Sequence, residues 1–138
     1  MPQIEMVLIP DLTRNQALVY EALLDASQPQ SAYALLAKVK SHGMRAPLQV
    51  YRALDVLIGH GMVHRVESIN AFIACSHPRV NPATATVIAV CSTCNVALEA
   101  HDELVEQHLL HWSSHRSFQC EKMTVEIKGT CGSCRAKA

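Results

Sequence analysis

The sequence predicts an α+β fold of two small domains joined by a short linker. Apolar residues recur at helical spacing through most of residues 13–59, whereas β-branched, strand-like segments become frequent after residue 84. Between the two regions, residues 77–82 contain two prolines and no apolar pattern. A chain of 138 residues can form one domain or two very small ones. We therefore expect domains at residues 1–76 and 84–138, with a hinge at residues 77–83.

The first domain is expected to contain three helices followed by a β-hairpin. Thr13 and Ser31 suit the N-cap positions of the first two helices, and Pro47 suits the first turn of the third. The helices should cover residues 13–27, 31–42 and 47–59, and the hairpin strands should cover residues 62–67 and 71–75. This order of elements is that of a winged helix, a variant of the helix-turn-helix.

The second domain is expected to be α/β. A strand over residues 84–90 runs directly into Cys91, and residues 96–98 supply its antiparallel partner, so Cys91 and Cys94 lie at a hairpin turn. A helix follows at residues 102–113, with Trp112 on its apolar stripe. We expect a further strand at residues 118–127, with Cys120 inside it.

Four of the six cysteines form two C-x-x-C pairs, and this spacing predicts a metal site. Cys91, Cys94, Cys131 and Cys134 together offer the sulfur ligands of a tetrahedral structural zinc. The chain shows no secretion signal and no apolar run of membrane-spanning length, so we expect a reducing cytoplasm, where disulfides are disfavoured. The alternative is a redox-active pair, although neither motif has a thioredoxin-like context.

The distribution of charge points to double-stranded DNA as a partner. Twelve basic residues balance twelve acidic ones, which excludes a uniformly basic protein. No acidic residue lies between Ala26 and Leu54, however, and the N-terminal part of a recognition helix is where base contacts are made. A solvated charged face is the alternative. The expected DNA-contacting residues are Thr13, Arg14, Lys40, Arg45, Gln49, Tyr51 and Arg52.

Several segments taken together resemble the ferric uptake regulator family. They are residues 50–55, residues 61–68, Cys75 and both C-x-x-C pairs. The stretch from His64 to Asn70, with the cysteine after it, is most similar to the zinc uptake regulator branch. The resemblance covers about residues 12–134. It implies a homodimeric, metal-dependent repressor whose C-terminal domain dimerises.

The resemblance also implies a second, regulatory zinc at the hinge. His64, Cys75 and Glu99 match three of the ligands that the branch uses. The fourth does not match, because residues 81–86, where the family has a histidine, contain none. Either His77 is the fourth ligand or the site is incomplete, and His101 is another candidate; we take His77. The expected cofactors are therefore one structural and one regulatory zinc ion per subunit.

These features favour a zinc-responsive repressor of zinc-uptake genes, with no membrane, no small-molecule substrate and no enzymatic activity. The sequence has no Ser/His/Asp arrangement, phosphate-binding glycine loop or carboxylate pair. Two alternatives remain open. One is a divergent paralogue that keeps the structural zinc and senses another signal, such as thiol oxidation at Cys75. The other is a thiol oxidoreductase or zinc-ribbon adaptor that does not bind DNA.

Overall fold

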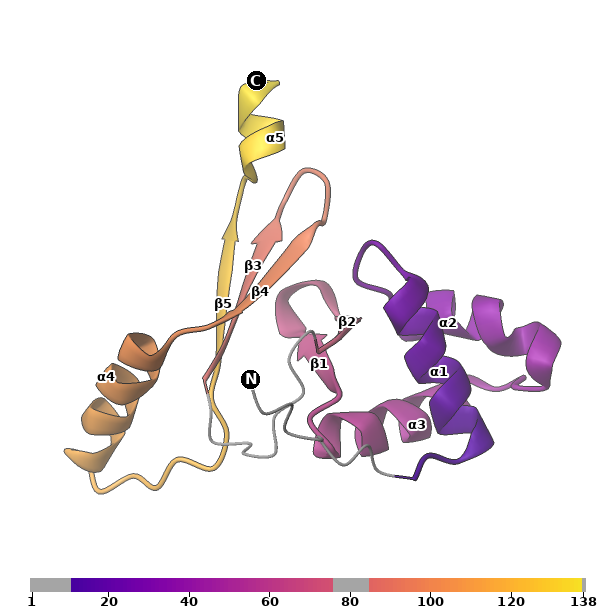
Figure 1. Ribbon diagram of the computed structural model, residues 1–138, viewed down its shortest axis with the longest axis horizontal. Coiled ribbons are helices and arrows are strands. Elements are labelled where there is room, and N and C mark those ends of the chain that lie inside the picture. Colours follow the sequence, from indigo (N-terminus) through magenta and orange to yellow (C-terminus); the bar gives the residue numbers. More distant parts are fainter. Residues whose placement is uncertain (1–10, 76–84, 138) are drawn as a thin grey trace, which may run out of the picture.

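Two domains lie side by side in the computed structural model of the chain, which describes residues 11–75 and 85–137 (Figure 1). The expected hinge at residues 77–83, His77 included, lies outside the described residues. The N-terminal elements are α1 (Arg14–Asp25), α2 (Ala32–Val39), the 3-10 turn η1 (Lys40–His42), α3 (Pro47–Gly59), β1 (Val63–Val66), the 3-10 turn η2 (Glu67–Ile69) and β2 (Ala71–Ala74). The C-terminal elements are β3 (Thr86–Cys91), β4 (Ala97–His101), α4 (Glu103–Ser114), β5 (Thr124–Gly129) and α5 (Gly132–Ala136). The predicted α+β fold is confirmed.

Local side-chain bonds define the helix starts of the N-terminal domain. The Thr13 hydroxyl accepts a hydrogen bond from the Gln16 amide at 3.3 Å, and the Gln16 carboxamide accepts one from the Thr13 amide at 3.1 Å. This reciprocal capping box satisfies two amides that the first turn of α1 leaves without partners. Ser31 caps α2 in a similar way, through the Ala34 amide. Both predicted N-caps are confirmed.

The helices and the hairpin of this domain enclose one apolar core. Most of its buried residues come from α1, α2, α3 and the hairpin, as the helical spacing predicts, and Met44 and Met62 come from the segments just before α3 and β1. The largest that are completely buried include Leu35, Met44, Leu54 and Leu57. In the hairpin, β1 and β2 pair antiparallel, and Phe72 of β2 also bonds the backbone of Gln30, ahead of α2. The hairpin is thereby fixed to the helical part.

The C-terminal sheet has the order β4-β3-β5 within the described residues. β3 pairs antiparallel with β4 and parallel with β5, and α4 makes the connection that a parallel pair requires. Ile88 and Val90 of β3 are buried together with Val66 of β1, so the wing hairpin completes this smaller core. The sheet therefore has one face against the winged helix.

The structure corrects the expected strand at residues 118–127. β5 begins at Thr124, which is paired with Thr86, the first residue of β3. A strand needs a hydrogen-bonded neighbour. Because β3 starts at Thr86, the residues ahead of Thr124 have no described strand to pair with and do not extend β5. Cys120 consequently lies in the connection before β5, half-buried, with its thiol 3.6 Å from the Lys122 carbonyl. Trp112 is 51% exposed and lies outside both cores.

Candidate metal centres

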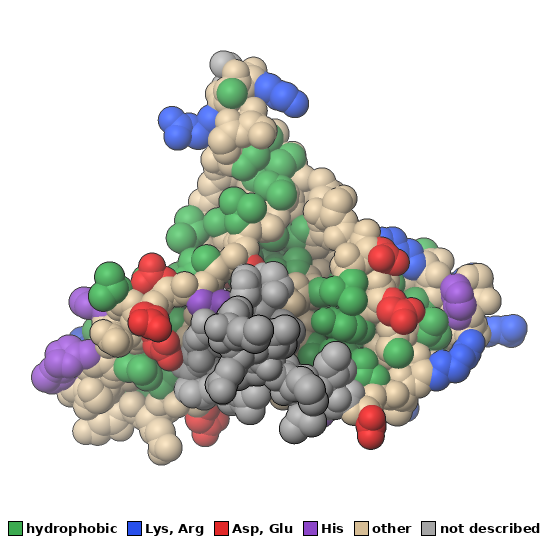
Figure 2. All heavy atoms as spheres, viewed as in Figure 1, with side chains coloured by type: hydrophobic (Ala, Val, Ile, Leu, Met, Phe, Trp, Pro, Cys, Tyr) green, Lys and Arg blue, Asp and Glu red, His purple; other side chains and the backbone are tan. Residues whose placement is uncertain are grey.

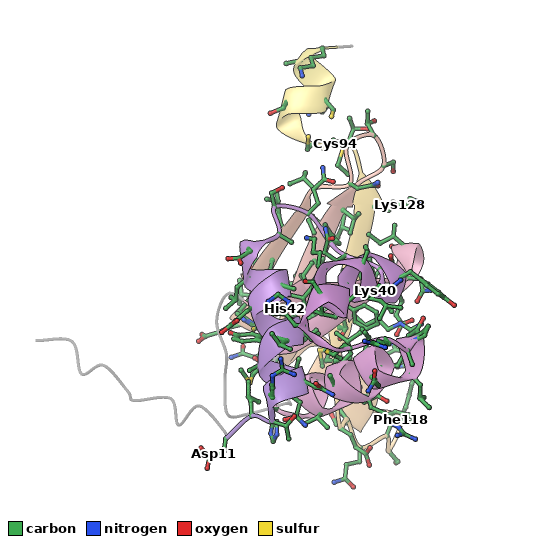
Figure 3. The ribbon with its side chains drawn as sticks, turned by 90° about the vertical axis from the view of Figure 1, so that its right-hand side faces the viewer. Asp11, Lys40, His42, Cys94, Phe118 and Lys128 are labelled. Atoms are coloured by element: carbon green, nitrogen blue, oxygen red, sulfur yellow. The ribbon has the colours of Figure 1, made fainter. Side chains whose placement is uncertain are left out.

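The two C-x-x-C pairs meet at one end of the C-terminal sheet. Cys91 ends β3 and Cys94 lies in the turn before β4, while Cys131 and Cys134 lie at the start of α5, just past β5. The parallel pairing of β3 with β5 places Cys91 opposite Gly129, which brings the second pair beside the first. Figure 3 shows Cys94 next to the first turn of α5. The predicted four-cysteine group is confirmed.

The spacing of the sulfur atoms in this group suits a zinc ion. All four lie within 4.8 Å of one another, and the Cys94 and Cys131 sulfurs are 3.8 Å apart. In a tetrahedron with Zn–S bonds of about 2.3 Å, the sulfurs stand ~3.8 Å apart. Four protein ligands leave no open position for catalysis, so a zinc ion here would serve the fold.

The electrostatics of the group already favour one thiolate. The Cys131 amide donates a hydrogen bond to the Cys91 sulfur at 3.3 Å, and such backbone bonds lower the pKa of Cys91 from 9.0 to about 6. Hydrogen bonding to the Cys131 side chain, followed by burial, raises the pKa of Cys134 to about 12. Metal binding requires the deprotonated thiolates, so a cation that binds this cluster takes the place of the thiol protons.

A second set of metal-binding residues lies between the two domains. This interdomain group consists of His64 on β1, Cys75 directly after β2 and Glu99 on β4, with its ligand atoms within 4.8 Å of one another. Glu99 Oε1 is 3.0 Å from His64 Nε2 and accepts a hydrogen bond from the Cys75 thiol at 3.2 Å. The Glu99 side chain is 5% exposed. The structure thus brings together three residues that the resemblance implied.

The donor set of the interdomain group fits zinc. Imidazole, thiolate and carboxylate are all zinc ligands, and tetrahedral sites with sulfur and nitrogen donors are typical of that metal. Two of the donors belong to the winged helix, and Glu99 belongs to the C-terminal sheet. A metal ion bound here would therefore connect the domains.

A cavity of about 290 Å³ adjoins the interdomain group. Its lining includes Cys75, Glu99 and the segment from Ala26 to Pro29. An ion could reach these two ligands from solvent through this space.

Two further contacts between the domains were not predicted from the sequence. The Glu126 carboxylate of β5 accepts hydrogen bonds from the amides of Glu67 and Ser68 in the wing, the second at 3.2 Å. The Gln28 carboxamide, between α1 and α2, donates to the Cys94 carbonyl at 2.8 Å. Each of these hydrogen bonds joins residues more than 55 positions apart, so no local sequence pattern could predict the contacts.

The expected DNA-contacting residues fall into two groups. Arg14, Lys40, Arg45 and Arg52 are exposed, and Lys and Arg side chains gather at the end of the molecule opposite α4 (Figure 2). Gly43 follows η1 as its C-cap, with a φ of 98°, and the Arg14 guanidinium lies close to it. Arg14 therefore lies beside η1, which begins at Lys40.

The remaining three expected contacts have a structural role. Thr13 is the cap of α1, and Tyr51 packs against the apolar core. The Gln49 carbonyl oxygen accepts hydrogen bonds from the amides of Arg45 at 2.9 Å and Ala46 at 3.2 Å.

Comparison with known proteins gives a consistent set of relatives. No protein-family model matches the chain. The zinc uptake regulation protein of Escherichia coli K12 is 33% identical over 105 residues, which are 75% of this chain and 61% of that protein. The holo form of XcZur superposes with a TM-score of 0.82 at 38% identity, over 91% of this chain and 86% of that one. A zinc uptake regulator in complex with zinc and DNA gives a TM-score of 0.84 at 28% identity, over 92% and 85%.

Proposed function

The chain belongs to the ferric uptake regulator family, and on that premise we propose that it is a zinc-responsive, DNA-binding transcription regulator and not an enzyme. Its more specific role is repression of zinc-uptake genes. The match spans about 61% of the length of the curated relatives, so this activity is carried over as a proposal. Among the described residues, no helix has the length and apolar character to cross a membrane.

The interdomain group is the observation that supports zinc sensing. Its ligands come from the wing strand β1, the end of the wing and the C-terminal strand β4. A zinc ion there stabilises the arrangement in which the two domains are held together, because it binds that arrangement better than a separated one. The four-cysteine group keeps its own zinc throughout and maintains the fold of the C-terminal domain.

The basic end of the winged helix supports DNA binding. In a helix-turn-helix, the second motif helix enters the major groove, and neighbouring cations contact phosphates. Arg52 on α3 is exposed and suits a guanine edge, while Arg14, Lys40 and Arg45 suit phosphates. The cap residues Thr13 and Gln49 position the helices that carry these cations.

An apolar surface on the C-terminal domain supports a homodimer. Monomeric proteins rarely expose large contiguous apolar patches, and in the sheet Leu98 and Ile127 both pair with Ala89, so they share one face. A second copy of the chain would cover these side chains and place two winged helices on one operator. They are Leu98, Leu104, Leu110, Trp112, Phe118 and Ile127.

Selection of DNA by the protein tests the proposal. A pool of random-sequence duplexes is enriched with zinc-loaded protein, and the selected duplex is then used in fluorescence anisotropy. Affinity should fall by about 10- to 100-fold when a chelator removes the interdomain zinc only. It should also fall steeply with salt. Equal affinity of protein with one and with two zinc ions would contradict zinc sensing and support the divergent paralogue.

A pair of variants tests the DNA surface separately. Arg52→Ala should weaken binding to the selected duplex by about tenfold or more, because it removes a base or phosphate contact. Lys128→Ala removes an exposed cation from β5 and should leave affinity within a few-fold of wild type. Retained affinity in Arg52→Ala would show that α3 does not face DNA.

A further inference from the structure

We propose that His101 is the fourth ligand of the interdomain zinc site, in place of His77, which we expected from the sequence. This inference rests on the proposed function, because it assumes that His64, Cys75 and Glu99 bind zinc. It changes how the site is built: two ligands would come from each domain.

The pleat of β4 places His101 on the same face as Glu99. Successive strand residues point to opposite sides of a sheet, so residues 97, 99 and 101 share one face. Along β4 the less exposed residues alternate with exposed ones, and Glu99 and His101 are on the less exposed side, whereas Ala100 is exposed. Pairing with β3 fixes this register, because Glu99 lies opposite Ile88 and His101 lies opposite Thr86. The shared face is the one that covers the wing hairpin.

A backbone carbonyl orients the imidazole ring of His101. Its Nδ1 lies 3.2 Å from the carbonyl oxygen of Ala85, which is completely buried. A carbonyl can only accept, so Nδ1 is the donor in this contact, and Nε2 is the ring nitrogen that is turned away from Ala85. A backbone carbonyl that orients the ring through the second nitrogen is a recurrent support of metal-binding histidines.

The Nε2 atom of His101 points toward the atom that the other ligands share. It lies 3.9 Å from Glu99 Oε1, and its side chain is 12% exposed, close to the 14% of His64. Ligand atoms around a tetrahedral zinc stand ~3.2–3.8 Å apart, given metal–ligand bonds of about 2.0–2.3 Å. The three distances to Glu99 Oε1 are 3.0, 3.2 and 3.9 Å. His101 is outside the group whose ligand atoms all lie within 4.8 Å of one another, so its ring must move toward His64 and Cys75 when the ion binds.

This arrangement gives a mixed set of two histidines, one cysteine and one glutamate. His64 and Cys75 come from the wing, whereas Glu99 and His101 come from one strand of the C-terminal sheet. The C-terminal domain would then hold a preformed half of the site on β4, and the wing would complete it.

Zinc titration of three single variants tests the inference. His101→Gln, His77→Gln and the control His108→Gln, whose histidine is exposed on α4, are titrated with zinc against a competing chelator. We expect His101→Gln to weaken the second zinc site by at least about 100-fold, since even the loss of a supporting group costs 10- to 100-fold. His77→Gln and His108→Gln should match wild type. Loss of the second zinc in His77→Gln, with retention in His101→Gln, would overturn the inference.

Two further measurements separate a lost ligand from a damaged fold. Each variant should retain one zinc per subunit and the circular dichroism of wild type. His101→Cys supplies a different ligand at the same place and should restore the second site. With cobalt as the probe, it should add a thiolate charge-transfer band to that of Cys75. Failure of His101→Cys to bind a second cobalt ion, while His101→Gln binds it normally, would also reject the assignment.

Zinc binding by the wild-type protein separates a failure of the proposed zinc sensing from a failure of the His101 assignment. If wild type binds only one zinc ion per subunit, the proposed zinc sensing fails. If wild type binds two and His101→Gln binds both with wild-type affinity, only the assignment of His101 fails.

Discussion

At the scale of single residues, Gln49 has a chemistry that suits adenine, but the structure uses its carbonyl oxygen to hold the start of α3. The oxygen accepts hydrogen bonds from the amides of Arg45 and Ala46, the two residues just ahead of α3. Gln49→Ala should therefore lower the free energy of unfolding by about 1 kcal/mol, as the loss of a cap does. Urea denaturation measures this difference.

The matched control for Gln49 is Glu21→Ala, at an exposed position in α1. It should change the free energy of unfolding by less than about 0.5 kcal/mol. If Gln49→Ala is as stable as this control but alters the base preference in DNA selection, direct base contact by Gln49 would be supported instead.

The residues of the interdomain group show how far the sequence could predict the site. Its wing residues could be assigned because they lie in a compact motif, His64 to Asn70, followed by Cys75. His101 could be placed on the face of Glu99 only after β4 and its pairing with β3 were known. Glu126 and Gln28 could not be assigned at all, because their partners lie on the other domain.

At the scale of elements, the strands that were predicted well are those whose limits are set locally. The wing hairpin turns at Asn70, which has a φ of 47°, and its two strands of four residues pair directly on either side of the turn. β5 is different, because its first residue is fixed by the start of β3, nearly 40 positions earlier. Apolar residues ahead of Thr124, such as Phe118, look strand-like in sequence but are exposed.

The contact between β5 and the wing gives a prediction at this scale. Glu126→Ala removes the acceptor for the Glu67 and Ser68 amides, and hydrogen bonds to a charged acceptor contribute about 1.5–3 kcal/mol. These two amides should exchange with solvent about tenfold faster or more, as measured by NMR. Glu121→Ala, an exposed carboxylate ahead of β5, should leave their exchange unchanged. Unaltered exchange in Glu126→Ala would mean that the wing does not depend on β5.

At the scale of the whole molecule, the two domains differ in what stabilises them. The winged helix buries a core drawn from α1, α2, α3 and the hairpin. The C-terminal domain buries mainly Ile88 and Val90, beside Val66 of the wing, and leaves large apolar side chains exposed. A small domain with so little core needs metal or a partner subunit to fold. The four-cysteine group, at the far end of the sheet, should therefore decide the stability of this domain.

Replacing one ligand of that group should unfold one domain and leave the other folded. Structural zinc in small domains contributes about 10–16 kcal/mol, and Cys134→Ser removes one of its four ligands. The chain carries its own reporters, because its single tryptophan, Trp112, is on α4 and its three tyrosines are in the helical domain. In Cys134→Ser, the thermal transition seen by Trp112 fluorescence should disappear or fall by tens of degrees. The tyrosine transition of the winged helix should persist. Cys120→Ser, outside both metal groups, should melt like wild type. If the two transitions of Cys134→Ser fell together, the domains would fold as one unit, and the zinc would stabilise the whole chain.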